Sequence, residues 1–316
     1  MVNTYKKLYI RLLTITLLPV LSGCFFTGVE NTGKITDKEV QRVISEIELR
    51  QPASSLTALA DSLPAWRVGK NFYATDDGLR LLFDRSSDYD IDTVSFSGKT
   101  LTYAGYDIVS SISGAQTVNI KLSNGRHSFV YRTNKTLDSF GPDFSIPLLI
   151  DMDAVNDVAR QLVGRDVYVK TSIWYDTNSE DVFTGRQYIP VRIIAVKPGN
   201  KVLPMKVVFT TSDELAQEAF VWISSPSATM HNRDFDSMFS LVDPRKNHPE
   251  ISDAHWSLII NGKVSQEMTK EECRLALGNP MRIAPVPDQA GMREYWYYDG
   301  GTYLYFVDGL LKSFRL

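Results

Sequence analysis

The chain has 316 residues, of which 43% are hydrophobic and 22% are charged, and its formal net charge is −3. This length is enough for two or three modest domains. The slight excess of acid disfavours nucleic acid as a partner, because a protein that binds nucleic acid needs a basic face. Two cysteines are too few for a zinc site built from four thiolates.

The N-terminal residues have the pattern of a secretory signal peptide. Three cations and no acid occur in the first dozen residues, and an apolar run from 12 to 21 follows. A membrane-spanning helix needs about 20 apolar residues, so this run is too short, and Pro19 would break a helix near its end. We therefore predict a signal peptide over residues 1–23, and a buried apolar helix is the alternative.

Small residues lead from this run directly into Cys24. The stretch Leu21-Ser22-Gly23-Cys24 resembles the lipobox of bacterial lipoproteins. The resemblance implies that Cys24 is acylated, and more than one acyl chain is sufficient for stable membrane anchoring. Phe25 stands where the inner-membrane retention signal would need Asp, so the resemblance points to the outer membrane, on its periplasmic or surface side. Loss of residues 1–23 removes three cations and no acid and changes the net charge from −3 to −6.

Residues 24–60 are expected to form a tether and one helix. Residues 25–35 have no clean hydrophobic period. Thr36 and Glu39 then have the spacing of a capping box, which begins a helix that Pro52 ends.

Two related β modules are expected over residues 61–150 and 151–228. The stretch VGKNFYAT at 68–75 is matched by VGRDVYVKT at 163–171, and FSGKTLTY at 96–103 by FTGRQYIP at 183–190. We read each module as a small barrel or curled sheet, which weakly resembles an SH3-type barrel. The repeat predicts that three pairs of residues occupy equivalent positions: Gly69 with Gly164, Gly98 with Gly185, and Tyr73 with Tyr168.

Three shorter signals complete this part of the chain. Asn124-Gly125, between two alternating runs, predicts a β-hairpin. The stretch IDMDAVNDVARQLVG predicts a helix at the start of the second module, ended by Gly164. Residues 229–250 have mixed polarity and two prolines, and we expect a linker there.

The last segment, 251–316, predicts an α+β domain in the order ααβββ, so the fold class is mainly β with an α+β C-terminal domain. Residues 252–260 form the first expected helix, stopped by Asn261-Gly262. Thr269 and Glu272 have capping-box spacing and open the second, which Gly278 ends. EYWYY, TYLYFV and LLKSFRL follow as three strands divided by Asp-Gly turns.

This order, with TKEECRLALGNP and EYWYYDGGTYLYFVDGLL, resembles the BamE-like family of outer-membrane lipoproteins, also called the small protein A/OmlA family. The family usually has Gly where this chain has Glu267. The resemblance implies an envelope location and a role in contacting proteins, and it implies no catalytic residue. The matching positions are Thr269, Leu277, Gly278, Pro280, Trp296, Tyr298, Phe306 and Gly309.

The sequence offers little for catalysis or metal binding. Cys273 is the one candidate thiol nucleophile after Cys24, and none of the four histidines, at 127, 231, 248 and 255, follows it. We therefore expect a buried structural cysteine. Asp151, Asp153 and Asp157 lack the glycine of a calcium loop, so we read them as acids at a helix start. No cofactor and no metal are predicted.

The aromatic strand 295–298 alternates its faces, so one face fills the core and the other is a candidate binding surface. The candidate binding residues are Tyr295, Trp296 and Tyr297. The favoured function is a lipid-anchored, non-enzymatic envelope protein that binds envelope proteins or peptidoglycan. The alternatives are a cell-wall hydrolase using Cys273 and a small-ligand carrier with its cavity in a β module.

Overall fold

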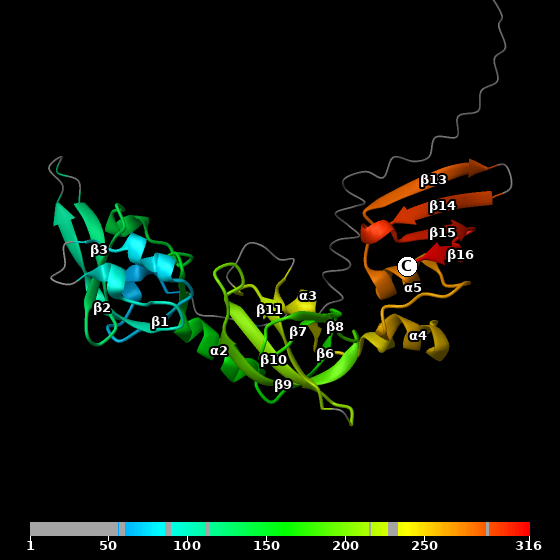
Figure 1. Ribbon diagram of the computed structural model, residues 1–316, viewed down its shortest axis with the longest axis horizontal. Helices are drawn as coiled ribbons and strands as arrows, with labels where there is room; N and C mark the ends of the chain where they lie inside the picture. Colours follow the sequence, from blue (N-terminus) through cyan, green and yellow to red (C-terminus); the bar gives the residue numbers. More distant parts are fainter. Residues whose placement is uncertain are drawn as a thin grey trace, which may run out of the picture. The chain divides into compact units, whose positions relative to one another are not determined.

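The computed structural model describes residue 56 and residues 61–85, 90–110, 114, 116–214, 216–226, 233–288 and 291–316. They belong to one compact unit, Ser54–Leu316. The predicted signal peptide, Cys24, the N-terminal helix and His231 lie outside the described residues. The described part is mainly β, as expected, and contains three antiparallel sheets (Figure 1).

The first sheet has five strands in the order β4-β3-β2-β1-β5. Its core contains seventeen buried residues, among them Trp66, Phe96 and Phe129. The predicted Asn124-Gly125 hairpin is confirmed, because it joins β3 to β4. The strands are β1 (Asn71–Ala74), β2 (Thr100–Ser110), β3 (Gln116–Ser123), β4 (Ser128–Arg132) and β5 (Leu149–Asp151).

The second sheet has seven strands in the order β12-β6-β9-β10-β11-β7-β8. Helix α2 (Met152–Leu162) packs its buried Val155, Val158 and Leu162 into the core of this sheet. The strands are β6 (Asp166–Val169), β7 (Ile173–Tyr175), β8 (Val182–Thr184), β9 (Ile189–Pro198), β10 (Met205–Thr211), β11 (Glu218–Ile223) and β12 (Phe239–Ser240).

The two sheets repeat one topology, with β6, β9, β10, β11 and β12 in the places of β1 to β5. Gly69 N–H donates to the Tyr103 carbonyl at 2.9 Å, and Gly164 N–H donates to the Ile193 carbonyl at 2.8 Å. Each long strand also carries a register shift just after this contact, following Tyr103 in β2 and Ile193 in β9. The predicted equivalence of Gly69 and Gly164 is therefore confirmed by the hydrogen bonding.

Tyr73 and Tyr168 are also equivalent, since each is the third, half-buried residue of a short strand with the same burial pattern. The pairing of Gly98 with Gly185 is wrong. Gly98 N–H donates to the Ala74 carbonyl at 2.9 Å, and the matching donor to Val169 is Tyr188, at 2.5 Å. Both donors have a left-handed backbone, with φ of 73° and 57°. Sequence similarity aligned the glycines, but the backbone position belongs to a tyrosine.

The segment 229–250, expected to be a linker, contributes secondary structure to the second sheet. Helix α3 (Phe235–Met238) leads directly into β12, and Phe239 pairs with Val169 of β6. Phe235 and Phe239 are buried and stack with ring centroids 5.2 Å apart. The two aromatic side chains therefore attach this segment to the second core.

The C-terminal domain has two helices and a four-stranded sheet in the order β13-β14-β15-β16. The capping box is confirmed at the start of α5, where the Thr269 and Glu272 side chains each accept from the other's backbone N–H. Trp256 and Cys273 from the helices join Trp296 and Phe306 from the sheet in one core. The elements are α4 (Asp253–Ile260), α5 (Lys270–Leu277), β13 (Arg282–Asp288), β14 (Gly291–Tyr297), β15 (Tyr303–Val307) and β16 (Leu310–Arg315).

The first strand of this sheet, β13, is a correction to the predicted order, which becomes ααββββ. Its sequence, RIAPVPD, contains Pro285 and Pro287, which argue against a central strand because proline has no N–H to donate. The strand lies at the edge of the sheet and pairs only with β14 among the described strands. An edge strand can carry prolines on its unpaired side, so the sequence pattern concealed it.

Gln187 joins the second sheet to the C-terminal domain. Its side chain is buried, and the carboxamide nitrogen lies 3.0, 2.8 and 2.9 Å from the carbonyl oxygens of Ile259, Leu275 and Ala276. Its backbone N–H donates to the Ile260 carbonyl at 3.0 Å. These acceptors lie in the last turns of α4 and α5, where helix carbonyls lack partners within the helix.

Candidate functional site

The register of the C-terminal sheet separates two faces of its aromatic strands. Trp296 pairs with Leu304 of β15, and both are fully buried under the helices. Tyr295 pairs with Tyr305, and Tyr297 with Tyr303, so these four tyrosines share the opposite face. All four are half-buried.

The four tyrosine rings form one cluster around Tyr295. Its ring centroid lies 4.6 Å from that of Tyr305, 6.2 Å from Tyr297 and 6.3 Å from Tyr303. These separations are in the range of favourable aromatic pairs. The four side chains therefore restrict one another's positions.

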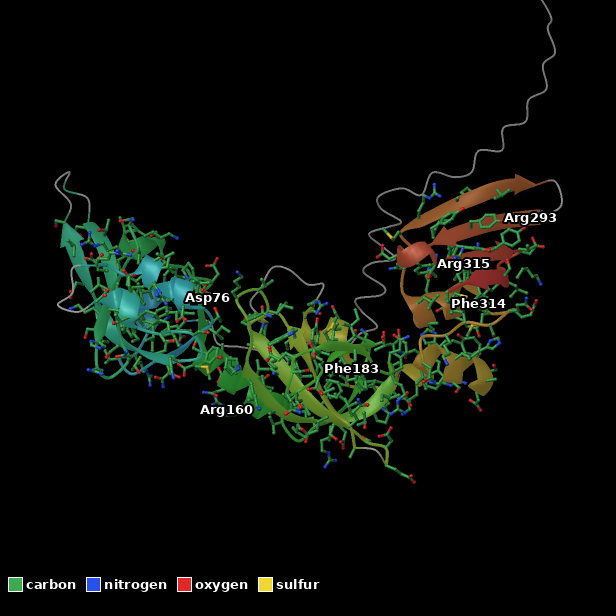
Figure 2. The ribbon with its side chains drawn as sticks, viewed as in Figure 1. Asp76, Arg160, Phe183, Arg293, Phe314 and Arg315 are labelled. Carbon is green, nitrogen blue, oxygen red and sulfur yellow. The ribbon has the colours of Figure 1, made fainter. Side chains whose placement is uncertain are left out.

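Arginines border this cluster. The Arg282 guanidinium lies 4.4 Å from the Tyr297 ring centroid, the distance of a cation–π contact. Arg315 pairs with Tyr303, and Arg293 lies two residues before Tyr295, so both are on the same face. Arg293 and Arg315 are labelled on the C-terminal sheet in Figure 2. We call the four tyrosines with Arg282, Arg293 and Arg315 the tyrosine face.

The tyrosine face is cationic within a chain of net negative charge. The register places no carboxylate on this face between Arg282 and Val286 of β13. The same is true of the positions on β14, β15 and β16 that pair with this stretch. The acid of the central strands, Glu294, lies on the other face and binds Lys270 at 2.7 Å. The tyrosine face thus offers aromatic surface and positive charge together.

Of the three predicted binding residues, Tyr295 and Tyr297 belong to the tyrosine face and Trp296 does not. Trp296 is 0% exposed, its ring centroid lies 4.6 Å from that of Phe306, and its indole N–H donates to Glu294 at 3.0 Å. It is a core residue because strand side chains alternate between faces. The same alternation in TYLYFV indicates Tyr303 and Tyr305, which the sequence interpretation missed.

Cys273 lies in the C-terminal core on α5 and is 0% exposed. Burial raises the pKa of its thiol to about 12, and the neighbouring Glu272 carboxylate adds to this shift. A nucleophilic cysteine needs a lowered pKa and access to substrate. Its burial and raised pKa favour a structural role.

The histidine of the C-terminal domain, His255, binds an acid. His255 Nδ1 lies 2.7 Å from Glu272 Oε1. Burial would raise the pKa of Glu272, but hydrogen bonds from Thr269 and His255 outweigh it and hold that pKa below its usual value. Among the described residues, no group of three or more His, Cys, Asp or Glu could hold a metal ion.

The acids at the start of α2 act as expected. The Asp151 carboxylate caps the helix by accepting from the Asp153 N–H at 2.9 Å. Lys70 forms ion pairs with Asp151 at 2.8 Å and Asp153 at 2.9 Å, and its side chain is only 4% exposed. Asp157 binds Arg160 on the same helix. The three acids thus cap and pair, which explains them without calcium.

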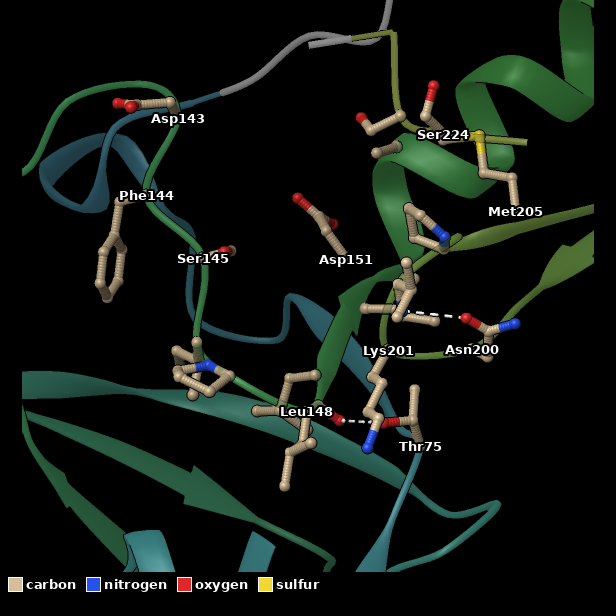
Figure 3. A pocket seen from close by; sticks show the side chains of 18 of the residues that line it. Thr75, Asp143, Phe144, Ser145, Leu148, Asp151, Asn200, Lys201, Met205 and Ser224 are labelled. Atoms are coloured by element: carbon tan, nitrogen blue, oxygen red, sulfur yellow. Dashed lines mark hydrogen bonds between the residues drawn. The ribbon is translucent and has the colours of Figure 1, made fainter. Parts of the chain in front are cut away.

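A cleft of about 350 Å³ lies between the two β modules (Figure 3). One wall is the segment 142–151, and the other contains residues 200–202, 204 and 205 with Ser224 and Ser225. The small-ligand carrier alternative places its cavity inside one β module, whereas this cleft lies between the two modules. No sequence signal marked it, because its walls come from distant parts of the chain.

No helix in the described part of the chain is long and apolar enough to span a bilayer. Comparisons with protein-family models, with curated proteins and with solved structures find no match to this chain.

Proposed function

We propose that this chain is a lipid-anchored, non-enzymatic protein of the bacterial outer membrane that binds an acidic segment of an envelope protein on its tyrosine face. The anchor is the acylated Cys24, and the β modules act as spacing and binding units. The observation that carries the proposal is the clustering of four tyrosines and three arginines on one face of the C-terminal sheet.

The chemistry of the tyrosine face suits a protein partner. Tyrosine and arginine are enriched at the residues that supply most of the binding energy in protein interfaces. Tyrosine adds a large contact area with little loss of side-chain entropy, and these rings already contact one another. Arginine binds carboxylates through two parallel hydrogen bonds, so the positive charge favours a segment rich in Asp and Glu.

The topology supports the domain assignments. Both β modules share one strand order, in which β5 pairs with β1 and β12 pairs with β6. In the C-terminal domain, Glu267 has φ of 69°, a left-handed conformation that glycine adopts most readily. The BamE-like family usually has Gly at this position, so the backbone conformation is consistent with the resemblance.

The burial of Cys273 supports a non-enzymatic protein over a cell-wall hydrolase. A thiol with a pKa of about 12 contains almost no thiolate at neutral pH. The core around it, including Met268 and Phe306, leaves the sulfur 0% exposed. A hydrolase would need this residue to become both exposed and ionised.

Site-specific photocrosslinking in intact cells tests the binding face. A benzoyl-phenylalanine placed at Tyr305 should give a discrete protein adduct, whereas the same residue at Tyr106 on β2 should not. Reversing two charges with Arg282→Glu and Arg315→Glu should reduce the Tyr305 adduct at least tenfold. Arg126→Glu, in the exposed β3–β4 turn, is the matched control and should leave it unchanged.

Two results would contradict the binding proposal. One is a Tyr305 adduct whose yield does not change when Arg282 and Arg315 are replaced by Glu. The other is the same set of adducts from Tyr305 and from Tyr106. The anchor is tested separately by labelling with an alkyne analogue of palmitate. Cys24→Ser should abolish the label and prevent processing to the mature size, and a labelled Cys24→Ser protein would refute lipidation at that residue.

A further inference from the structure

The cleft between the β modules has the size and construction of a small-ligand site. Its volume of about 350 Å³ lies within the range of ligand pockets, roughly 300–1,000 Å³. Figure 3 shows Asp143, Phe144 and Ser145 on one wall and Asn200, Met205 and Ser224 on the other. Of the lining residues, Trp66 and Leu149 belong to the first core and Ile150 and Met205 to the second, so an occupant would contact both modules.

Ser224 supplies a buried polar group that the described part of the chain does not satisfy. The residue is 6% exposed and lines the cleft, and its Oγ has no hydrogen-bond partner there. Its backbone N–H already donates to the Arg233 carbonyl at 2.8 Å. Buried hydroxyls are almost always hydrogen-bonded, so a ligand that supplies a donor or an acceptor completes this one.

Opposite charges reach the cleft from its opposite walls. The Asp151 carboxylate is already used, because it binds Lys70 at 2.8 Å and caps α2. Asp143 on one wall and Lys201 on the other form no ion pair within the described residues. They remain available to a ligand that carries both a cation and an anion.

The lining of the cleft also includes apolar side chains. Pro147 and Leu148 contribute on one wall and Val202 and Pro204 on the other, while Asp61 adds a third carboxylate to those of Asp143 and Asp151. An apolar body with a free amino group, a free carboxylate and hydrogen-bonding amides is a short peptide. We propose that this cleft binds a short apolar peptide with free termini.

In this arrangement the peptide's amino group binds Asp143, its carboxylate binds Lys201, and one of its amides bonds to the Ser224 hydroxyl. The apolar side chains of the peptide contact the proline-rich walls. Each interaction comes from a different segment of the chain, so recognition requires both modules. The site is independent of the tyrosine face, which lies on the C-terminal sheet.

Calorimetric titration of the full chain in detergent micelles with trileucine tests the proposal. Trileucine should bind saturably with one peptide per chain, and at least tenfold more tightly than N-acetyl-trileucine amide, which lacks both terminal charges. Lys201→Glu should weaken binding at least tenfold, and Ser224→Ala about threefold. Lys197→Glu and Ser257→Ala replace exposed residues outside the cleft and are the matched controls.

Equal affinity for the free and the blocked peptide would overturn the assignment of charges. Unchanged trileucine binding by Lys201→Glu and Ser224→Ala would overturn the location. Lys201 is exposed, so its variant should keep the thermal unfolding temperature of the parent chain. Loss of binding together with unchanged unfolding is therefore the supporting result.

Discussion

Gln187 is the residue whose replacement should uncouple the C-terminal domain from the second β module. Its carboxamide has two N–H groups, and three carbonyl oxygens lie within 3.0 Å of the nitrogen. At least one hydrogen is therefore shared between two acceptors. The residue is 7% exposed, so water does not readily replace these bonds.

Gln187→Ala removes both donors and leaves buried carbonyls of α4 and α5 without this partner. An unsatisfied buried group costs about 1–3 kcal/mol. We therefore expect the free energy of local opening of α4 and α5 to fall by about 2 kcal/mol. That loss corresponds to about a 30-fold increase in the opening that allows amide hydrogen exchange.

Gln187→Glu keeps the shape but places a carboxylate against the negative ends of two helices. Its folded-state pKa should rise above the unfolded value of about 4.3, because the charged form is disfavoured. The unfolded state then loses its proton first, so stability falls as pH rises through the window above about 4.3. The variant should be less stable than Gln187→Ala at pH 7 and recover towards it at pH 4.

Hydrogen exchange measured by mass spectrometry on peptides from α4 and α5 checks these expectations. Gln217→Ala is the control, because Gln217 is exposed and its side chain makes no hydrogen bond within the described residues. The reasoning is refuted if exchange in Gln187→Ala equals that of the parent chain. It is also refuted if Gln187→Glu has the same effect at pH 4 and at pH 7, since a buried carboxylate must titrate.

Three further expectations concern the cores. Native Cys273 should resist a thiol reagent at pH 7, and labelling within minutes by the folded chain would contradict its burial. Burial lowers the pKa of Lys70, but its bonds to Asp151 and Asp153 outweigh burial and raise this pKa above 10.5. The stabilisation by Lys70 should therefore persist below pH 10.5 and disappear at higher pH. A pH titration of thermal unfolding with Lys70→Met as reference measures this, and loss of the stabilisation at neutral pH would contradict the expectation. Gly185→Ala should lower the free energy of unfolding by about 3 kcal/mol, because its Cβ would lie 2.1 Å from the Trp174 ring. Gly98→Ala should lower it by about 1 kcal/mol, because the φ of Gly98 is +73°. Equal losses for the two variants in chemical denaturation would contradict this reasoning.

Local signals in the sequence located several elements correctly. The Thr269–Glu272 capping box, the Asp151 helix start and the Asn124-Gly125 hairpin all depend on residues within a few positions of one another. Gly69 and Gly164 were likewise matched through short repeated stretches. The helix caps and the hairpin are predictable because their hydrogen bonds close within a single turn, whereas the hydrogen bonds of Gly69 and Gly164 join separate strands.

The tyrosine face was predictable in part. Alternation along one strand separates Tyr295 and Tyr297 from Trp296, but choosing the core face requires knowing where the helices pack. Tyr303 and Tyr305 join the cluster through pairing across strands, which one strand's sequence does not reveal. The similar glycine-containing stretches matched Gly98 with Gly185, but the residue equivalent to Gly98 is Tyr188. Tyr188 has a left-handed backbone, which its residue type does not indicate.

The sequence by itself determined the mainly β class, the helix starts and the hairpins, because these follow from side-chain pattern and local hydrogen bonding. Only the tertiary structure decided that proline-bearing β13 adds an edge strand and that β12 joins the second sheet. It also decided that Gln187 reaches two helix ends and that segments 142–151 and 200–205 enclose a cleft. These features depend on contacts between residues up to about 90 positions apart, and their free energy becomes available only after the intervening chain has folded.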